Sequence, residues 1–391
     1  MSANIKLPDD IELLKAKLLE AINPICSAVG STKAEKDFLF TAQRTDAGRK
    51  LPPYYLCYFL FVDLLGFKNL GQFEKISWSV PLDYKGTAYL LEHRKFGLGL
   101  FAADKDKQEN EAKEIVKLIH KAVRQARPYF EWRALEASKN SELNVLNHSR
   151  RLFSRFEYFL NEYHNKAEEA KLRKDERIVT DLGNGAQTIS MPGYELKRNS
   201  EWLAISAIDS FFSWTEHIFI HAAALKGNIS TGEDVANLAD EEWANKFKAA
   251  LDIKDQHIKP YYDQLVELKR QIRNYIAHGA FGKRGEAFQV HSGAGAIPLL
   301  LPHQKGNARF SFQGDLGFDE GAAIKLLKDF LSIYWESKTY PEVIYIKSDL
   351  PTILTYVDNG TYKSAMVSVN EMENYVDHLS GEFDRAANMD W

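Results

Sequence analysis

The stretch from Glu201 to Leu225 constrains the fold most, because its apolar side chains surround a helix instead of following one face. They are Trp202, Ile205, Ile208, Phe211, Phe212, Trp214, Ile218, Phe219 and Leu225. A helix that is apolar over most of its circumference is buried among other helices. The sequence therefore predicts a helical bundle with residues 201–225 at its centre and Ser200 as the N-cap of this helix.

A second amphipathic helix is predicted from Pro260 to His278, where Leu265, Leu268, Ile272 and Ile276 form a core-facing stripe. Asn274 and His278 are four residues apart and share a face, and the long side chain of Arg273 can reach the same point. A guanidinium, an amide and an imidazole together can bind a phosphate and move a proton. The structural alternative is a solvated Arg and a His that interacts with the helix dipole.

Further helical patterns complete a bundle at residues 146–338. They cover residues 130–163 (with an interruption near 139–141), 240–251 and 319–335. Residues 174–198 lose all periodicity, so a long loop is predicted there. Strands are predicted at 288–291 and 308–312, as an inserted hairpin.

The flanking segments change from a helical to a strand period. Residues 1–104 are predicted to form a small α+β domain, with helices at 9–22 and 51–66 and strands at 73–80, 87–93 and 96–101. Residues 105–145 are expected to be connecting helices. Residues 339–391 are expected to hold a strand at 343–346, a β-hairpin around Asp358-Asn359-Gly360 and a helix at 370–383. The expected fold class is mostly α (α+β), a helical bundle with small flanking α+β segments.

The composition is that of an ordinary soluble protein, with 45% apolar and 27% charged residues and a net charge of −4 in 391 residues. A nucleic-acid site must therefore be a local basic patch. Cys26 and Cys57, in apolar surroundings, are expected to be buried thiols. The longest apolar run, Tyr54 to Phe67, contains Asp63 and is too short for a bilayer. We expect a cytoplasmic protein without a signal peptide, a membrane partner, a metal ion or a cofactor.

Three other motifs have competing interpretations. His217 and His221 have a spacing that can hold a metal, but the zincin pattern is absent and a hydrogen-bonded core role is favoured. Residues 92–95 (Glu-His-Arg-Lys) can form a ligand site, although a polar hairpin edge is favoured. The Gly-x-Gly string at 293–295 lacks the strand-then-helix setting of a phosphate loop.

The string Arg273-Asn274-x-x-x-His278 resembles the R-N-x-x-x-H signature of the HEPN superfamily, the helical domains of many prokaryotic ribonucleases and toxins. The resemblance covers about residues 146–338. It implies a HEPN-like bundle that cleaves RNA without metal, by attack of the 2′-OH on the adjacent phosphorus. It also implies a homodimer in which two motif helices form one composite cleft, because one chain supplies one His of this kind.

The resemblance gives each motif residue a role. His278 serves as acid or base, Arg273 binds the phosphate, and Asn274 orients the His or the scissile phosphate. The family also places a polar or acidic residue on the preceding long helix. Here Asp209 and Glu216 are the supporting candidates, with Arg273 as the expected partner across the bundle and exposure to solvent as the alternative. The candidate RNA-binding residues are Lys269, Arg270, Lys283 and Arg284.

The expected function is thus a HEPN endoribonuclease acting as a toxin or phage-defence effector, with an antitoxin or a phage trigger protein as a possible partner. Ala280 stands where some members carry the Tyr that a nucleotidyltransferase antitoxin modifies, which argues against that form of control. One alternative is a non-catalytic HEPN-like module that binds nucleotide, RNA or a partner protein. Another is a small-molecule enzyme with its active site in residues 1–104, although no motif in that segment supports this interpretation.

Overall fold

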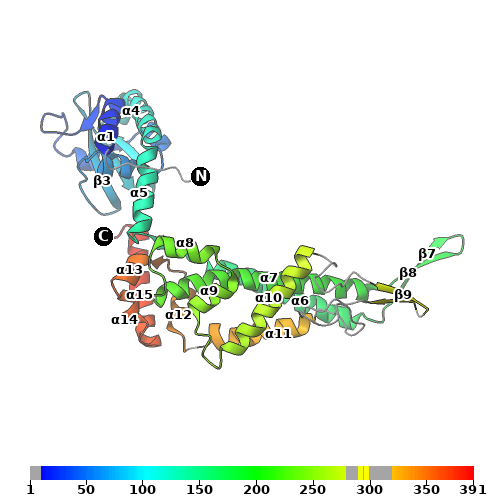
Figure 1. Cartoon of the computed structure of the whole chain (residues 1–391). Coiled ribbons are helices and arrows are strands. Elements are labelled where there is room, and N and C mark those ends of the chain that lie inside the picture. Colours follow the sequence, from blue (N-terminus) through cyan, green and yellow to red (C-terminus); the bar gives the residue numbers. More distant parts are fainter. Residues whose placement is uncertain (1–9, 279–288, 294, 299–318, 338) are drawn as a thin grey trace. The chain divides into compact units, whose positions relative to one another are not determined.

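The computed structural model describes residues 10–278, 289–293, 295–298, 319–337 and 339–391 (Figure 1). The chain is mostly helical with small antiparallel sheets. It forms two compact units: unit 1 comprises Met1–Asn140 and Asp377–Trp391, and unit 2 comprises Ser141–Val376. The expected division at residues 104, 145 and 338 differs from this one. The predicted connecting helices belong to unit 1, and most of the predicted C-terminal segment belongs to unit 2.

Unit 1 is built on a five-stranded antiparallel sheet of order β1-β3-β4-β5-β2. The strands are β1 (Ile25–Ser27), β2 (Gln43–Arg44), β3 (Ile76–Tyr84), β4 (Thr87–Arg94) and β5 (Gly97–Ala102). The three predicted strands are confirmed as β3, β4 and β5, with ends shifted by a few residues. Val80, Leu82 and Leu91 are fully buried, so the central strands contribute directly to the core.

Unit 1 also contains helices, most of which share one hydrophobic core with this sheet. They are α1 (Ile11–Ile22), α2 (Phe38–Thr41), η1 (Ala47–Lys50), α3 (Tyr54–Tyr58) with its π-helical continuation η2 (Phe59–Leu64), α4 (Lys105–Gln125), α5 (Arg127–Lys139) and the end of α15 (Val369–Asn388). The Asp104 side chain caps α4 by accepting the N–H groups of Asp106 and Lys107. Ile115 and Ile119 are fully buried in the same core as the sheet, so α4 is a core element and not a connector.

The last residues of the chain bind the start of β3. Trp391 donates its indole N–H to the carbonyl of Ile76 at 3.0 Å, and the backbone N–H of Lys75 donates to Met389 at 3.1 Å. Asp390 forms an ion pair with Lys75. Unit 1 is therefore assembled from two segments that are far apart in the sequence.

Unit 2 is a helical bundle around α7 (Pro192–Leu225), which runs beside α6 (Ser149–Leu172) in Figure 1. The other elements are α8 (Gly232–Asp240), α9 (Trp243–Ala250), α10 (Lys259–His278), α11 (Glu320–Phe330) with η4 (Leu331–Trp335), α12 (Pro341–Lys347), α13 (Leu354–Asp358), α14 (Thr361–Ala365) and the pair β6 (Asn144–Val145) and β11 (Thr352–Ile353). Trp214 is fully buried, 4.9 Å from the rings of both Phe153 and Trp335. The prediction of a central helix over 201–225 is confirmed.

Two predictions near the start of α7 are wrong. The expected loop at 174–198 contains a hairpin of β7 (Ile178–Gly183) and β8 (Ala186–Ser190), turned at Asn184-Gly185, where both residues have positive φ. Ser200 is not an N-cap: it lies inside α7 and donates its hydroxyl to the carbonyl of Lys197 at 2.7 Å. Every residue of the two strands is exposed, so neither strand has a buried face. The sequence therefore lacks the alternation of apolar and polar residues by which a strand is predicted.

Strand predictions near the C-terminus are also wrong. The segment 343–346 belongs to helix α12, and the expected hairpin around Asp358-Asn359-Gly360 is the junction of helices α13 and α14. Gly360 has φ of 80°, the left-handed conformation that commonly ends a helix. The strand predicted at 288–291 is confirmed as β9 (Gln289–Ser292), which pairs with β10 (Gly295–Pro298), while 308–312 lies outside the described residues.

Among the described residues, no helix combines the length and the apolar character needed to cross a bilayer.

Candidate functional site

The predicted motif lies on the last two turns of α10, which is helical through His278. Arg273 is exposed. The side chains of Asn274 and His278 lie outside the described residues, as do Lys283 and Arg284. The backbone therefore places the motif residues on one helix end, with the arginine facing solvent.

Helix α10 packs against α7, as the bundle prediction requires. Its buried face carries Leu265, Leu268 and Ile272. Lys269 lies on the boundary of this face, with its ammonium 5.0 Å from the centre of the Phe212 ring and 2.6 Å from Oε1 of Glu216. The helix that carries the motif is thus held against the centre of the bundle one turn before Arg273.

Glu216 is held by two lysines. Besides Lys269, it accepts a hydrogen bond of 3.1 Å from Lys246 on α9, a residue whose surface is only 5% exposed. Burial acts to raise the pKa of Glu216, but the hydrogen bonds and charges of Lys269 and Lys246 outweigh it, so the pKa lies below its ordinary value. The carboxylate is therefore ionised at neutral pH and joins three helices.

This pairing corrects the expected role of the supporting acids. The cations that hold Glu216 are Lys246 and Lys269, not Arg273. Asp209 is exposed, so it needs no partner inside the bundle. The alternative of exposure to solvent is the correct one for Asp209. The structure does not bring these acids together with the motif arginine.

The predicted RNA-binding residues of α10 have local partners. Lys269 pairs with Glu216 and so has a structural contact, while its assignment as an RNA-binding residue stays a prediction. Arg270 pairs with Glu267 one turn earlier on the same exposed face. Because an exposed pair of this kind contributes at most about 1 kcal/mol, Arg270 can exchange Glu267 for a phosphate at little cost.

His217 and His221 are part of a hydrogen-bonded network. The backbone N–H of His148 donates to Nε2 of His217 at 2.8 Å, this atom is 3.2 Å from Nε2 of His221, and Nδ1 of His221 is 2.7 Å from Oγ1 of Thr352. Burial lowers the pKa of His217 to about 4 and that of His221 to about 3. Both are neutral at physiological pH, in the core role that the sequence favoured. Within the described parts of the chain, no three His, Cys, Asp or Glu side chains gather as a metal site.

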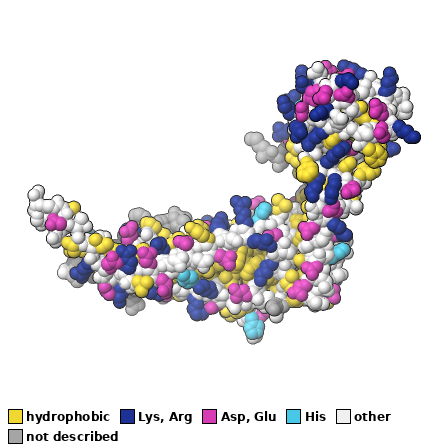
Figure 2. All heavy atoms as spheres, turned by 180° about the vertical axis from the view of Figure 1, so that it is seen from behind, with side chains coloured by type: hydrophobic (Ala, Val, Ile, Leu, Met, Phe, Trp, Pro, Cys, Tyr) yellow, Lys and Arg dark blue, Asp and Glu magenta, His cyan; other side chains and the backbone are white. Residues whose placement is uncertain are grey.

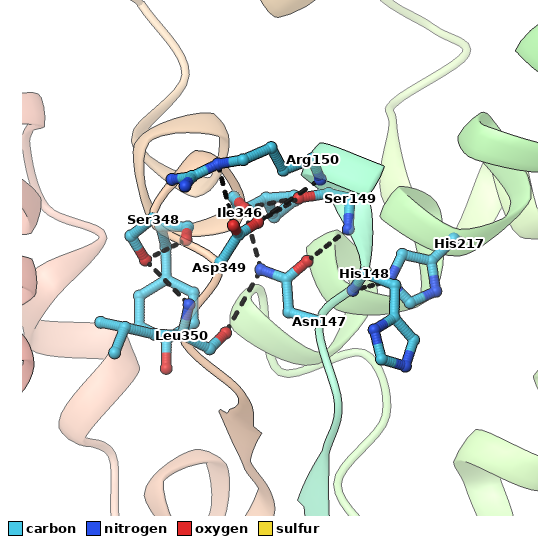
Figure 3. A network of polar contacts seen from close by, with 10 residues as sticks. Asn147, His148, Ser149, Arg150, His217, Ile346, Ser348, Asp349 and Leu350 are labelled. Atoms are coloured by element: carbon cyan, nitrogen blue, oxygen red, sulfur yellow. Dashed lines mark hydrogen bonds and ion pairs between the residues drawn. The ribbon is translucent and has the colours of Figure 1, made fainter. Parts of the chain in front are cut away.

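The same region ties the start of α6 to the loop after α12 (Figure 3). Asn147 donates to the carbonyls of Ile346 and Leu350 at 2.8 and 3.2 Å, and Ser149 donates its hydroxyl to Ile346. Arg150 forms an ion pair of 2.9 Å with Asp349. Figure 3 shows His217 pointing at the His148 backbone beside this network, so the histidines help to hold elements together.

The candidate site at residues 92–95 is a hairpin edge, as favoured. Glu92 is buried and accepts hydrogen bonds from Ser79 at 2.7 Å and from Nε of Arg94 at 2.8 Å. Its charge is therefore satisfied within the sheet. The cysteines are only partly as predicted: Cys57 is buried, but Cys26 is exposed on the short strand β1.

Unit 2 also contains a pocket that the sequence did not predict. This pocket of about 800 Å³ lies between the end of α6, the start of α7 and the start of α11, and several lysines line it. The lysines of residues 171–174 and Lys197 were visible in the sequence, but the predicted loop at 174–198 placed them on no common element.

Comparisons with protein-family models, with curated proteins and with solved structures give no significant match to this chain. The resemblance stated above therefore depends on the residues of α10 and on their place in the bundle.

Proposed function

We propose that unit 2 is a metal-independent endoribonuclease of the HEPN type. The observation that carries this proposal is the position of Arg273-Asn274-x-x-x-His278 on the final turns of α10, a helix packed against the central helix of a bundle. The adjacency of the two helices is what the resemblance predicts. Arg273 is exposed and can therefore meet an RNA phosphate.

The proposed reaction is a transfer within the RNA. The 2′-OH attacks the adjacent phosphorus, the bond to the 5′ oxygen of the next nucleotide breaks, and a 2′,3′-cyclic phosphate and a 5′-hydroxyl result. His278 acts as acid or base in the movement of the proton, because an imidazole titrates near neutral pH. Arg273 offers paired N–H donors to the phosphoryl oxygens as charge develops, and Asn274 orients the imidazole or the phosphate.

The motif supplies one His per chain, His278, and therefore one proton-transfer group, whereas the reaction needs an acceptor and a donor. We therefore propose a homodimer in which two copies of α10 meet and share one cleft. In the cell, such an enzyme acts as a toxin or a phage-defence effector, held in check or triggered by a protein partner.

The test is an RNA cleavage assay on the full chain in the presence of EDTA. Wild type should cleave, and His278→Ala should abolish cleavage while RNA affinity stays close to that of wild type. His257→Ala, an exposed histidine in the loop before α10, is the matched control and should cleave normally. Circular dichroism verifies that each variant is folded. Normal cleavage by a folded His278→Ala variant would rule out the assignment.

The second candidate, a non-catalytic RNA-binding or partner-binding module, is separated by the same assay. It predicts that wild type binds RNA without releasing a 2′,3′-cyclic phosphate product. Expression in host cells gives an independent readout. The ribonuclease proposal predicts growth arrest by wild type and normal growth with His278→Ala.

A further inference from the structure

Lysine is the most frequent charged residue around the pocket between α6, α7 and α11. Five lysines line it, namely Lys171, Lys174, Lys197, Lys325 and Lys328. Three carboxylates also line it, namely Glu168, Asp175 and Glu320. Cations thus outnumber anions by two among the described lining residues. Lys325 is paired with Asp329 on the same helix at 2.5 Å, so the other four lysines are the candidates to bind an anionic ligand.

Three of these lysines form only long ion pairs with a carboxylate. The ammonium groups of Lys171, Lys174 and Lys197 are 3.8, 3.9 and 3.9 Å from their nearest acid oxygens. These distances are too long for hydrogen bonds, and all three side chains are largely exposed. Their ammonium groups can turn toward a ligand without breaking an existing hydrogen bond.

Lys328 is positioned by a histidine. Its ammonium is 2.8 Å from Nε2 of His164, which accepts the hydrogen bond in its neutral form. Burial and the charge of Lys328 both lower the pKa of His164, so the imidazole stays neutral beside the lysine. The arrangement fixes one donor of Lys328, and no carboxylate of the described residues forms an ion pair with it.

The N-terminus of α7 adds to the positive potential. Met191, the N-cap, makes no side-chain cap hydrogen bond, and Gly193 and Tyr194 line the pocket. A Cβ on Gly193 would come within 2.8 Å of the carbonyl oxygen of Arg173, so only glycine lets this helix end approach the end of α6. A helix N-terminus favours a negative charge, and here Glu195 in the first turn and the carbonyl of Arg173 already supply part of it.

We propose that this pocket binds the polyphosphate group of a small molecule, either an inorganic polyphosphate or a nucleoside di- or triphosphate. A volume of about 800 Å³ matches sites for ligands of that size. The ring of Tyr194, 69% exposed at the pocket wall, offers a stacking surface for a base.

A bound RNA strand is the less suitable occupant. Strands of nucleic acid follow a continuous basic groove. On the face of unit 2 seen in Figure 2, dark-blue and magenta side chains alternate, and no basic stripe runs along it. The lysines of the pocket instead come from the end of α6, the start of α7 and the length of α11, and they line one cavity.

The experiment is calorimetric titration of the full chain with inorganic tripolyphosphate and with ATP, with orthophosphate as reference. Both should bind, and orthophosphate should bind more weakly because it carries fewer charges. Equal affinities for tripolyphosphate and ATP would show that the polyphosphate group is sufficient for binding. Tighter binding of ATP than of tripolyphosphate would identify a nucleotide as the ligand. Lys197→Gln and Lys328→Gln should each weaken binding about tenfold, the loss expected for a partly exposed charge-assisted hydrogen bond. Lys328→Arg should restore most of it.

Two controls make the result decisive. Lys254→Gln makes the same charge change on an exposed residue outside the pocket and should leave the affinity unchanged. His278→Ala should also bind tripolyphosphate normally, so the pocket and the ribonuclease proposal can fail separately. The proposal is overturned if neither ligand binds, if Lys254→Gln weakens binding as much as the pocket variants do, or if only an RNA oligonucleotide depends on these lysines.

Discussion

Glu216 lies on the central helix between two lysines that come from different helices, and the three side chains join α7, α9 and α10 at one point. The lysine from α9 is buried, so its charge depends on this carboxylate. Removing one partner of a buried ion pair is strongly destabilising, because the other charge is left uncompensated. The position of the motif helix is therefore coupled to the state of one carboxylate.

Glu216→Gln should lower the free energy of unfolding by about 3 kcal/mol, because Lys246 would remain buried without an anion. Urea denaturation at neutral pH measures this change. Glu201→Gln on the same helix, whose side chain is 43% exposed, is the matched control and should have little effect. Equal stability of Glu216→Gln and wild type would contradict the role of this carboxylate.

The same residue predicts a pH dependence. The pKa of Glu216 is lower in the folded chain than its ordinary value of 4.5, so the unfolded chain binds its proton more readily. Its contribution to stability is complete above pH 4.5 and is lost as the pH falls through the folded-state pKa. The difference in stability between wild type and Glu216→Gln should shrink over that range, and a constant difference would oppose this assignment.

Substitutions of Arg273 can separate the role of its positive charge from the role of its paired N–H donors. Arg273→Ala should reduce the rate of RNA cleavage by about 10²-fold, by comparison with the loss of one oxyanion donor. Arg273→Lys should recover little of this loss, because an ammonium keeps the charge without the bidentate fork. The control is Arg155→Ala, an exposed arginine on α6. Full activity of Arg273→Lys would show that positive charge alone is required.

Among the elements, two Asn-Gly pairs show what local sequence can and cannot predict. Asn184-Gly185 forms the turn of an exposed hairpin, whereas Asn359-Gly360 separates two helices. Both glycines have φ near 80°, but Asn184 also has a positive φ of 55°, whereas Asn359 has a φ of −82°. The flanking residues decide the outcome: Leu354, Tyr362 and Ala365 are buried at helical positions, while the strands of the hairpin bury nothing.

Deleting the hairpin of β7 and β8 should leave unit 2 folded. All residues of these strands are exposed and none of them belongs to the buried core, including Ile178, Val179, Leu182 and Ile189, so their removal forfeits little burial of apolar surface. A short Gly-Ser linker in place of residues 178–190 should leave the thermal midpoint unchanged. A large decrease in that midpoint would mean that the hairpin contributes to the core.

At the scale of the whole molecule, the bundle and the sheet could be predicted, and their boundaries could not. Periodicity revealed α7, α10 and the strands of unit 1, because each buries a regular face. The packing of α4 on the sheet is a long-range contact that local patterns do not contain. For the same reason, the pairing of Glu216 with Lys269 and not with Arg273 was not predictable, since it depends on the rotation and offset of α10 against α7.

The proposed homodimer makes a prediction about concentration. Specific cleavage activity should fall on dilution through the dissociation constant of the dimer, because neither protomer alone supplies both proton-transfer groups. Light scattering coupled to size-exclusion chromatography gives the mass at the same concentrations. Undiminished activity in a monomeric sample would contradict a shared cleft.

The two-segment construction of unit 1 also has a consequence for synthesis of the chain. The hydrogen bonds of Lys75 and Ile76, at the start of β3, are made with residues 389–391, which are the last to be synthesised. In the sequence, the residues of unit 2, 141–376, separate the two segments. At ribosomal rates of about 5–20 residues per second, translating that insert takes on the order of ten to fifty seconds. During this interval the N-terminal segment has left the ribosome, but the start of β3 lacks its hydrogen bonds to residues 389–391. The helices of unit 2 emerge in the meantime and can fold before unit 1 is complete.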